Sequence, residues 1–245
     1  MMSFGYQKLK QKEAFVVIGG PCAIESKEQL FQTAKQIKGQ INILRGGAFK
    51  PRTSPDSFQG LGEEGLKLLK QAGKLIDKPT ITEVMEPDKV ELVAKYSDIL
   101  QIGARNMQNY PLLTRVGGID KPVMLKRGLS ATIDEWLAAV KYITSEGNKK
   151  VILCERGIRT FETKTRFTLD LAGALKAKRI SNLPVIIDPS HATGDKELIE
   201  PMVKAAKAAG FDGVMVETHN NPEEALCDKD QALTTSVFNK IFDRL

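Results

Sequence analysis

Short runs of apolar, β-branched residues alternate along the chain with longer amphipathic stretches. Each run is apolar throughout, as expected for a strand that is covered on both faces. Eight runs predict strands, at residues 15–18, 43–44, 80–84, 99–102, 123–125, 151–153, 185–187 and 213–216. Helical periodicity follows most of them, at residues 27–37, 66–75, 89–94, 133–143, 168–178, 196–209 and 231–242. This alternation predicts parallel βαβ units.

The number of strands and the length of the chain favour one closed barrel. The chain has 245 residues, of which 42% are hydrophobic, enough for one domain with a sizeable core. Eight βα units in this length predict a single-domain (β/α)8 (TIM) barrel more readily than an open doubly wound sheet. The segment GGPCAI after the first strand lacks the third glycine of G-x-G-x-x-G, which disfavours a dinucleotide-binding fold. We expect residues 14–245 to form the barrel and residues 1–13 to be an N-terminal extension.

The bulk charge narrows the class of partner. The formal net charge is +6, which suits anionic partners, but the lysines are scattered without a basic block, so we expect no nucleic-acid partner. No run approaches the roughly 20 apolar residues of a membrane span, and the polar N-terminus lacks the apolar core of a secretory signal. Cys22, Cys154 and Cys227 are odd in number and widely spaced, which indicates a reducing, cytoplasmic compartment.

Cations follow several of the predicted strands. In a barrel of this kind, the carboxyl ends of the strands converge on the face where chemistry takes place. Six basic residues lie there: Arg45, Lys50, Arg52, Arg105, Lys126 and Arg156. Arginine offers forked donors for phosphate and carboxylate, and lysine supplies a point charge and an acid. The set predicts one substrate with a phosphate and a carboxylate, or two phosphorylated substrates. The alternative is that each cation is a rim residue paired with a nearby acid.

A second set at the same strand ends has the donors of a metal site. It contains Cys22, His191, Glu217 and one further acid, either Asp228 or Asp230. A thiolate, an imidazole and two carboxylates suit a first-row divalent ion such as zinc, iron(II), manganese(II) or copper(II). The chain has no C-x-x-C pair, which disfavours a closed structural zinc site.

Three other polar residues at the strand ends have less defined roles. His219 follows Glu217 by two residues, and we expect it in a loop or outside the ligand set. Glu83 and Asp188 either fix a lysine or a histidine of the site or are structural acids.

Six long motifs resemble those of the 3-deoxy-D-arabino-heptulosonate 7-phosphate (DAHP) synthases, in particular the short type I beta subfamily. They are GPCAIES (20–26), LRGGAFKPRTSP (44–55), QIGARNMQN (101–109), LKRG (125–128), ILCERGIRTFE (152–162) and IDPSHATG (187–194). The resemblance extends from about Ala14 to the C-terminus. It implies a transferase that condenses phosphoenolpyruvate with erythrose 4-phosphate, the first step of the shikimate pathway of aromatic amino acid biosynthesis.

The resemblance also implies specific site residues. The ligands of one divalent ion (Mn²⁺, Fe²⁺, Zn²⁺, Co²⁺ or Cu²⁺) would be Cys22, His191, Glu217 and Asp228, which selects Asp228 over Asp230. Phosphoenolpyruvate would be bound by Arg105, Lys126 and Arg156, with Arg45 and Lys50 nearby. Erythrose 4-phosphate would be held by Lys50, Pro51, Arg52 and Thr53, with Arg52 and Thr53 on its phosphate.

Lys50, Cys22 and His191 are the expected catalytic residues. Lys50 would protonate the new alkoxide, and we expect its neighbouring cations to lower its pKa. The loop ALCDKDQAL (225–233) departs from the family pattern, and Cys227 beside Asp228 is a candidate competing ligand or oxidation partner of Cys22. The family further implies a homodimer or homotetramer. The short N-terminus predicts an enzyme insensitive to aromatic amino acids and prephenate.

Two alternatives accompany this interpretation. Synthases of 3-deoxy-D-manno-octulosonate 8-phosphate join phosphoenolpyruvate to arabinose 5-phosphate, but their sugar-binding segment typically reads KANRSS where this chain has KPRTS. The proline shortens and stiffens that loop, which favours the four-carbon sugar. The non-enzyme alternative is a barrel that binds a phosphate ligand or RNA and releases no phosphate from phosphoenolpyruvate.

Overall fold

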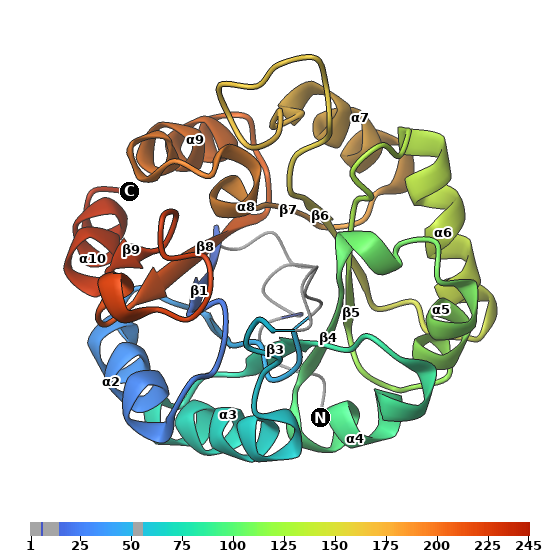
Figure 1. Cartoon of the computed structure of the whole chain (residues 1–245). Coiled ribbons are helices and arrows are strands. Elements are labelled where there is room, and N and C mark those ends of the chain that lie inside the picture. The colour runs from blue at the N-terminus through green and yellow to red at the C-terminus, as the bar shows by residue number, and fades with distance from the viewer. Residues whose placement is uncertain (1–5, 7–14, 51–55) are drawn as a thin grey trace.

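Eight parallel strands close into a barrel that helices surround on the outside (Figure 1). The computed structural model describes Tyr6, residues 15–50 and residues 56–245. Each strand pairs with the next, and β1 also pairs with β8, which closes the sheet. The strands are β1 (Val16–Gly20), β2 (Ile43–Arg45), β3 (Thr80–Glu83), β4 (Ile99–Ile102), β5 (Val123–Lys126), β6 (Val151–Glu155), β7 (Val185–Ile187) and β8 (Gly213–His219). The predicted (β/α)8 barrel is confirmed.

The outer ring contains two helices that the periodicity did not predict. The described helices are α2 (Lys27–Ile37), α3 (Gly62–Ile76), α4 (Val90–Tyr96), α5 (Tyr110–Gly117), α6 (Ile133–Ser145), α7 (Leu171–Ser181), α8 (Pro189–Thr193), α9 (Lys196–Ala208) and α10 (Thr235–Asp243). Of these, α5 and α8 are short and each has a proline in its first turn. An amphipathic pattern cannot be recognised over the five residues of α8, whereas α5 is longer than the predicted α4 and was missed although a proline and a side-chain cap mark its start.

The start of α10 corrects the sequence prediction. Helical periodicity placed the helix from residue 231, but it begins at Thr235. The side chain of Thr234 accepts a hydrogen bond from the backbone of Val237 and caps the helix there. The residues before it form a short strand, β9 (Leu233–Thr234), which pairs with the far end of β8. Pairing with β8 therefore takes the backbone groups that a longer helix would have used.

The barrel interior is apolar below its carboxyl end. Side chains that face inwards along the strands form one buried cluster, consisting of Val16, Ile18, Ile43, Ile81, Ile99, Met124, Ile152, Cys154, Ile186 and Met215. Tyr6 is buried in the same cluster, and its hydroxyl donates to the carbonyl of Lys149. A larger cluster lies between the strands and the helices and includes the fully buried Trp136. Apolar packing thus leaves the carboxyl ends of the strands as the place where polar side chains converge.

Three residues expected to bind substrate, Pro51, Arg52 and Thr53, lie outside the described residues. Within the part of the chain that the structure describes, no helix combines the length and the apolar character needed to cross a membrane.

Candidate active site

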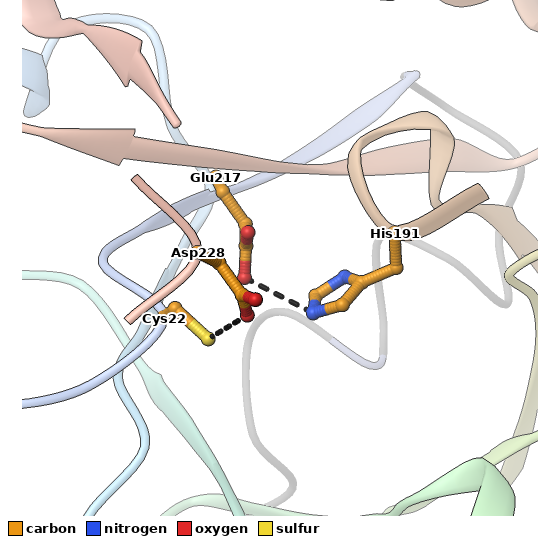
Figure 2. Close-up of side chains that lie close together, drawn as sticks. All are labelled: Cys22, His191, Glu217 and Asp228. Carbon is orange, nitrogen blue, oxygen red and sulfur yellow. Dashed lines mark hydrogen bonds and ion pairs between the residues drawn. The ribbon is translucent and has the colours of Figure 1, made fainter. Parts of the chain in front are cut away.

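Four side chains from three barrel units meet at the carboxyl end of the barrel (Figure 2). Cys22 follows β1, His191 lies in α8, Glu217 is in β8, and Asp228 lies in the loop before β9. One ligand atom of each lies within 4.8 Å of all the others. The Cys22 thiol donates to Oδ2 of Asp228 at 2.9 Å, and Nε2 of His191 lies 3.0 Å from Oε1 of Glu217. The predicted ligand set is therefore assembled in one place.

Local backbone features bring these residues together. Glu217 continues the inward-facing series of Met215 along β8, and its backbone N–H donates to the hydroxyl of Ser190 in α8. Gly20 ends β1 with φ +144, and a Cβ there would lie 2.2 Å from the carbonyl oxygen of Arg45. Only glycine permits this approach, which turns the chain towards β2 and carries Cys22 into the mouth of the barrel.

The loop before β9 brings one of the two candidate acids, Asp228, into the four-residue group. Asp228 has φ +52, a left-handed conformation that aspartate tolerates better than most residues. Its carbonyl accepts from the backbone of Gln231 and Ala232, which closes the loop as a turn. Asp228 belongs to the four-residue group, whereas Asp230 does not. The loop departs from the family pattern in sequence, yet Asp228 lies at the position that the resemblance implies.

The thiol and the carboxylates of the group hold protons differently. Burial acts to raise the pKa of Glu217, but the charges of His191 and Arg45 hold it well below its usual range. Burial, with Glu217 and Asp228 adding to it, raises the pKa of Cys22 well above its usual range. Cys22 is thus a protonated donor to Asp228 in this arrangement. A divalent cation among these four groups would favour the thiolate, which is the form that binds metals.

Asp188 connects the metal-ligand group to the cations of the site. This fully buried carboxylate ends β7, and its Oδ2 lies 2.7 Å from Nδ1 of His191 and accepts from Nζ of Lys126 at 2.6 Å. Burial acts to raise its pKa, but His191 and Lys126 lower it strongly. Asp188 therefore fixes the ring of a candidate metal ligand, one of the two roles that the sequence left open for it.

A polar cavity opens beside this group. Its walls include the five described cations that the sequence singled out, Arg45, Lys50, Arg105, Lys126 and Arg156. Two of them pair with acids: Arg45 donates to Glu217 at 2.8 Å and Lys126 donates to Asp188. The alternative that each cation pairs with a nearby acid therefore holds for Arg45 and Lys126. Their ion pairs are buried in the site, however, and do not lie on its rim.

Arg105 and Arg156 differ from the other cations. Neither forms an ion pair with a carboxylate among the described residues, and Nη1 of Arg156 is buried without a hydrogen-bond partner there. The guanidinium of Arg156 stacks 4.4 Å from the centroid of the Phe167 ring. Burial lowers the pKa of Arg156. These two cations are therefore available to an anionic ligand.

The prediction for the pKa of Lys50 was wrong in direction. Burial and Arg45 act to lower this pKa, as expected for a cation among cations, but the net shift is upwards. The cause is Cys22: Nζ of Lys50 donates to its Sγ and to its carbonyl oxygen, both at 2.9 Å. The Cys22 sulfur accepts a hydrogen bond from the ammonium group, and negative charge on that sulfur would stabilise the ammonium form further. No sequence pattern indicated that the two side chains touch.

Arg166 and Gln231 also belong to the site, although sequence reasoning missed them. Nη1 of Arg166 donates to the side chain of Gln231 at 2.7 Å and lies 3.8 Å from Asp228. The amide of Gln231 in turn donates to Oε2 of Glu217. Both residues lie on loops several positions away from a strand end, so their position relative to a strand gave no signal.

The remaining predicted residues lie beside the site. Glu83 lines the cavity and accepts from the Gln101 side chain at 3.4 Å, so its direct partner is neither a lysine nor a histidine. His219 is the last residue of β8 rather than part of a loop, and it lies outside the metal-ligand group, as expected. Its Nδ1 accepts from the backbone of Asn221, and its Nε2 lies 3.5 Å from Glu25. Cys227 shares a small buried cluster with Cys22.

Comparisons with known proteins identify the family. The chain is 47% identical over 232 residues to phospho-2-dehydro-3-deoxyheptonate aldolase from Thermotoga maritima, covering 94% of this chain and 69% of the relative. A 2-dehydro-3-deoxyphosphooctonate aldolase from Desulfatibacillum aliphaticivorans is 33% identical over 253 residues, covering 94% and 90%.

A solved structure and a family model agree with the first of these relatives. The crystal structure of the Thermotoga maritima phospho-2-dehydro-3-deoxyheptonate aldolase (DAHP synthase) superimposes with a TM-score of 0.91, over 94% of this chain and 68% of that one. Residues 8–243 match the model of the DAHP synthetase I family. The chain therefore belongs to the DAHP synthetase I family.

Proposed function

We propose that the cavity at the carboxyl end of the barrel condenses phosphoenolpyruvate with erythrose 4-phosphate. The products are 3-deoxy-D-arabino-heptulosonate 7-phosphate and inorganic phosphate. Carbon 3 of phosphoenolpyruvate bonds to the aldehyde carbon of the sugar, water adds at carbon 2, and the phosphate leaves from that carbon. The chain is thus a transferase of the shikimate pathway.

One observation carries the proposal: two arginines without carboxylate partners among the described residues line a cavity that His191 and Asp228 of the four-residue group also line. A condensation of two phosphorylated substrates needs anion binding and activation of a carbonyl at adjacent points. The same cavity has residues suited to both tasks. The family match and the 47% identical relative support the same reaction.

Arg105, Lys126 and Arg156 are the proposed binding residues for phosphoenolpyruvate. They come from the ends of neighbouring strands β4, β5 and β6, so their charges face one part of the cavity. Arginine donors match both the carboxylate and the phosphate of this substrate. By neutralising its charges, these residues would hold it beside a second phosphorylated molecule in a reactive orientation.

The group of Cys22, His191, Glu217 and Asp228 is the proposed metal site. Its thiol, imidazole and two carboxylates suit a first-row divalent ion, and the ligand atoms lie close enough to surround one. Such an ion supplies Lewis-acid activation of the sugar aldehyde when bound. The choice between Mn²⁺, Fe²⁺, Zn²⁺, Co²⁺ and Cu²⁺ depends on supply as well as on donors.

Lys50 lies between the two parts of the site. Its ammonium group contacts Cys22 and lines the cavity that Arg105 and Arg156 also line. It is the proposed proton donor to the alkoxide that forms from the aldehyde, because an alkoxide is far more basic than a lysine amine, although the raised pKa makes Lys50 a weaker acid than an ordinary lysine. The next residues, Pro51, Arg52 and Thr53, are proposed to hold erythrose 4-phosphate and its phosphate group.

A direct test compares two sugars. The purified chain with Mn²⁺ and phosphoenolpyruvate should release phosphate with erythrose 4-phosphate and much more slowly with arabinose 5-phosphate. Faster release with arabinose 5-phosphate would assign the chain to octulosonate 8-phosphate synthesis, the activity named for the 33% identical relative. Binding of phosphoenolpyruvate without release of phosphate with either sugar would favour a binding barrel.

Chelation tests the metal separately. Treatment with EDTA should abolish phosphate release, and added Mn²⁺ or another of the proposed ions should restore it. Full activity of the chelated protein, with no bound metal by elemental analysis, would contradict the assignment.

We further propose that the enzyme acts in the cytoplasm as a homodimer or homotetramer. Size-exclusion chromatography with light scattering would check the oligomeric state.

A further inference from the structure

A buried ion network lies directly behind two of the cations proposed to bind phosphoenolpyruvate. Along β5 and β6, inward-facing side chains alternate with side chains that face the helices. Lys126 and Arg156 continue the inward series and line the cavity. Arg127, which follows Lys126, and Glu155, which precedes Arg156, are buried on the opposite side of the strands.

Arg127 joins several elements through its guanidinium. Its Nη1 donates to Oε2 of Glu155 at 3.0 Å and to Oδ2 of Asp170 at 2.8 Å, and its Nε donates to the carbonyl of Ala131 at 2.9 Å. Asp170 also caps α7, because its Oδ1 accepts from the backbone of Gly173. The strand β5, the end of β6, the loop after β5 and the start of α7 therefore meet at one guanidinium.

The network fixes the backbone on both sides of Arg156. Oε1 of Glu155 accepts from the backbone N–H of Gly157 at 2.7 Å, which spans Arg156. Gly157 has φ +93, and a Cβ there would lie 2.7 Å from Cβ of Phe167, so only glycine fits this turn. The Arg156 side chain has no carboxylate of its own among the described residues. Its place in the cavity therefore depends on this backbone.

The same network also acts on Lys126. The last paired residues of β5 and β6 are Lys126 and Cys154. The backbone of Arg127 extends the pairing by one step, because its N–H donates to the carbonyl of Cys154 at 2.9 Å. The ion pair between Arg127 and Glu155 thus connects the two strands at the point where they deliver their cations.

From these contacts we infer that Arg127, Glu155 and Asp170 are positioning residues, which set the distance and direction of Lys126 and Arg156 for phosphoenolpyruvate. The inference rests on the proposed function of the cavity. The side chains of the network contact none of the four metal-ligand residues, so we expect their effect to fall mainly on phosphoenolpyruvate, although Lys126 is linked to His191 through Asp188. A buried ion pair of this kind specifies geometry more than it adds stability.

The test is Glu155→Gln, which keeps the size of the side chain and an acceptor for Gly157 but removes the charge opposite Arg127. We expect the KM for phosphoenolpyruvate to rise about tenfold or more, the scale of one lost charged hydrogen bond, while the KM for erythrose 4-phosphate stays within about twofold. A KM for phosphoenolpyruvate within twofold of wild type, or equal rises for both substrates, would overturn the inference.

Two further variants keep the test decisive. Asp170→Asn leaves Glu155 in place. It should raise the KM for phosphoenolpyruvate, but by less than Glu155→Gln does, and it can be measured even if Glu155→Gln does not fold. Asp120→Asn removes the exposed carboxylate that pairs with Lys150 at the opposite end of the same two strands. This control should leave both KM values unchanged. If it raised the KM for phosphoenolpyruvate as much as Glu155→Gln does, the loss of any charge on these two strands would have the same effect.

Binding of inorganic phosphate separates this inference from the proposed function. Calorimetry with phosphate alone reports on the cation cavity whatever reaction follows. Wild-type protein that consumes phosphoenolpyruvate with neither sugar would refute the proposed function. Even in that case, the positioning role predicts a weaker affinity for phosphate in Glu155→Gln and Asp170→Asn than in Asp120→Asn. Equal phosphate affinities in all three variants would refute the positioning role.

Discussion

The two sides of the cavity hold their charges differently. Towards β1 and β8, each cation has a partner within the protein, since Arg45 pairs with Glu217 and Lys50 with Cys22. Towards β4 and β6, Arg105 and Arg156 have no carboxylate partner among the described residues. The first side is balanced by its own acids and thiol, whereas the second side carries uncompensated positive charge.

This difference indicates which side needs which ligand. A buried guanidinium without a partner costs free energy that an anion would recover on binding. On the other side, the acids already attract the cations around them, and a divalent ion would have to compete with those contacts for its ligands. Lys126 lies between the two sides, because Asp188 connects it to His191. We therefore expect substitutions on the two sides to fail in different ways.

The largest effect is expected on the metal-ligand side. Cys22→Ser replaces the soft ligand and should lower both metal content and kcat. We expect a loss greater than the roughly 10- to 100-fold typical of removing an outer partner of a metal ligand. The affinity for phosphoenolpyruvate should change little. Elemental analysis, kinetics and calorimetry on the same preparation measure the three quantities.

Cys154→Ser is the matched control for this prediction. Cys154 is equally buried but lies on β6, outside the four-residue group. Burial raises its pKa to about 12, so it remains a thiol at neutral pH. The control should keep its metal and most of its activity. Equal metal content in Cys22→Ser and Cys154→Ser would remove Cys22 from the ligand set.

A smaller and different effect is expected on the cation side. Arg156→Gln should raise the KM for phosphoenolpyruvate about 10- to 150-fold, because a buried charged hydrogen bond contributes roughly 1.5–3 kcal/mol. Arg105→Gln, at an exposed position, should raise it no more than about fivefold, within the range of exposed ion pairs. Metal content should be normal in both. Loss of metal in Arg156→Gln would contradict the division of the cavity into two sides.

The strands of the barrel could be predicted because they are buried on both faces. A continuous apolar run such as Val185–Ile187 is a signal that needs no tertiary information. The five-residue helix α8 gave no such signal, since it is too short for a periodic pattern. The first residue of α10 depended on the pairing of β9 with β8, which is a tertiary contact.

The candidate site was predictable as far as strand ends determine it. Cys22, Glu217 and Lys126 follow or end strands, so barrel topology alone brings them to one face. Arg166 and Gln231 enter through loop conformation, which the pattern of apolar residues does not encode. The pKa of Lys50 depends on a single 2.9 Å contact with Cys22, and no sequence rule places that contact.

The smallest effect is a change in how stability depends on pH. The pKa of Asp188 is lowered in the folded chain, although burial opposes this, because His191 and Lys126 favour its ionised form. The unfolded chain takes up the proton near pH 4, so this stabilisation is present above pH 4 and is lost as the pH falls further. In metal-free protein, Asp188→Asn should lack this loss, up to about 1.4 kcal/mol per pH unit. Urea unfolding between pH 5 and pH 3 measures how the free energy of unfolding changes with pH in each protein. The exposed control Glu64→Gln should follow wild type. If the free energy of unfolding of Asp188→Asn changed with pH in parallel with that of wild type, Asp188 would not connect the two sides as an ionised group.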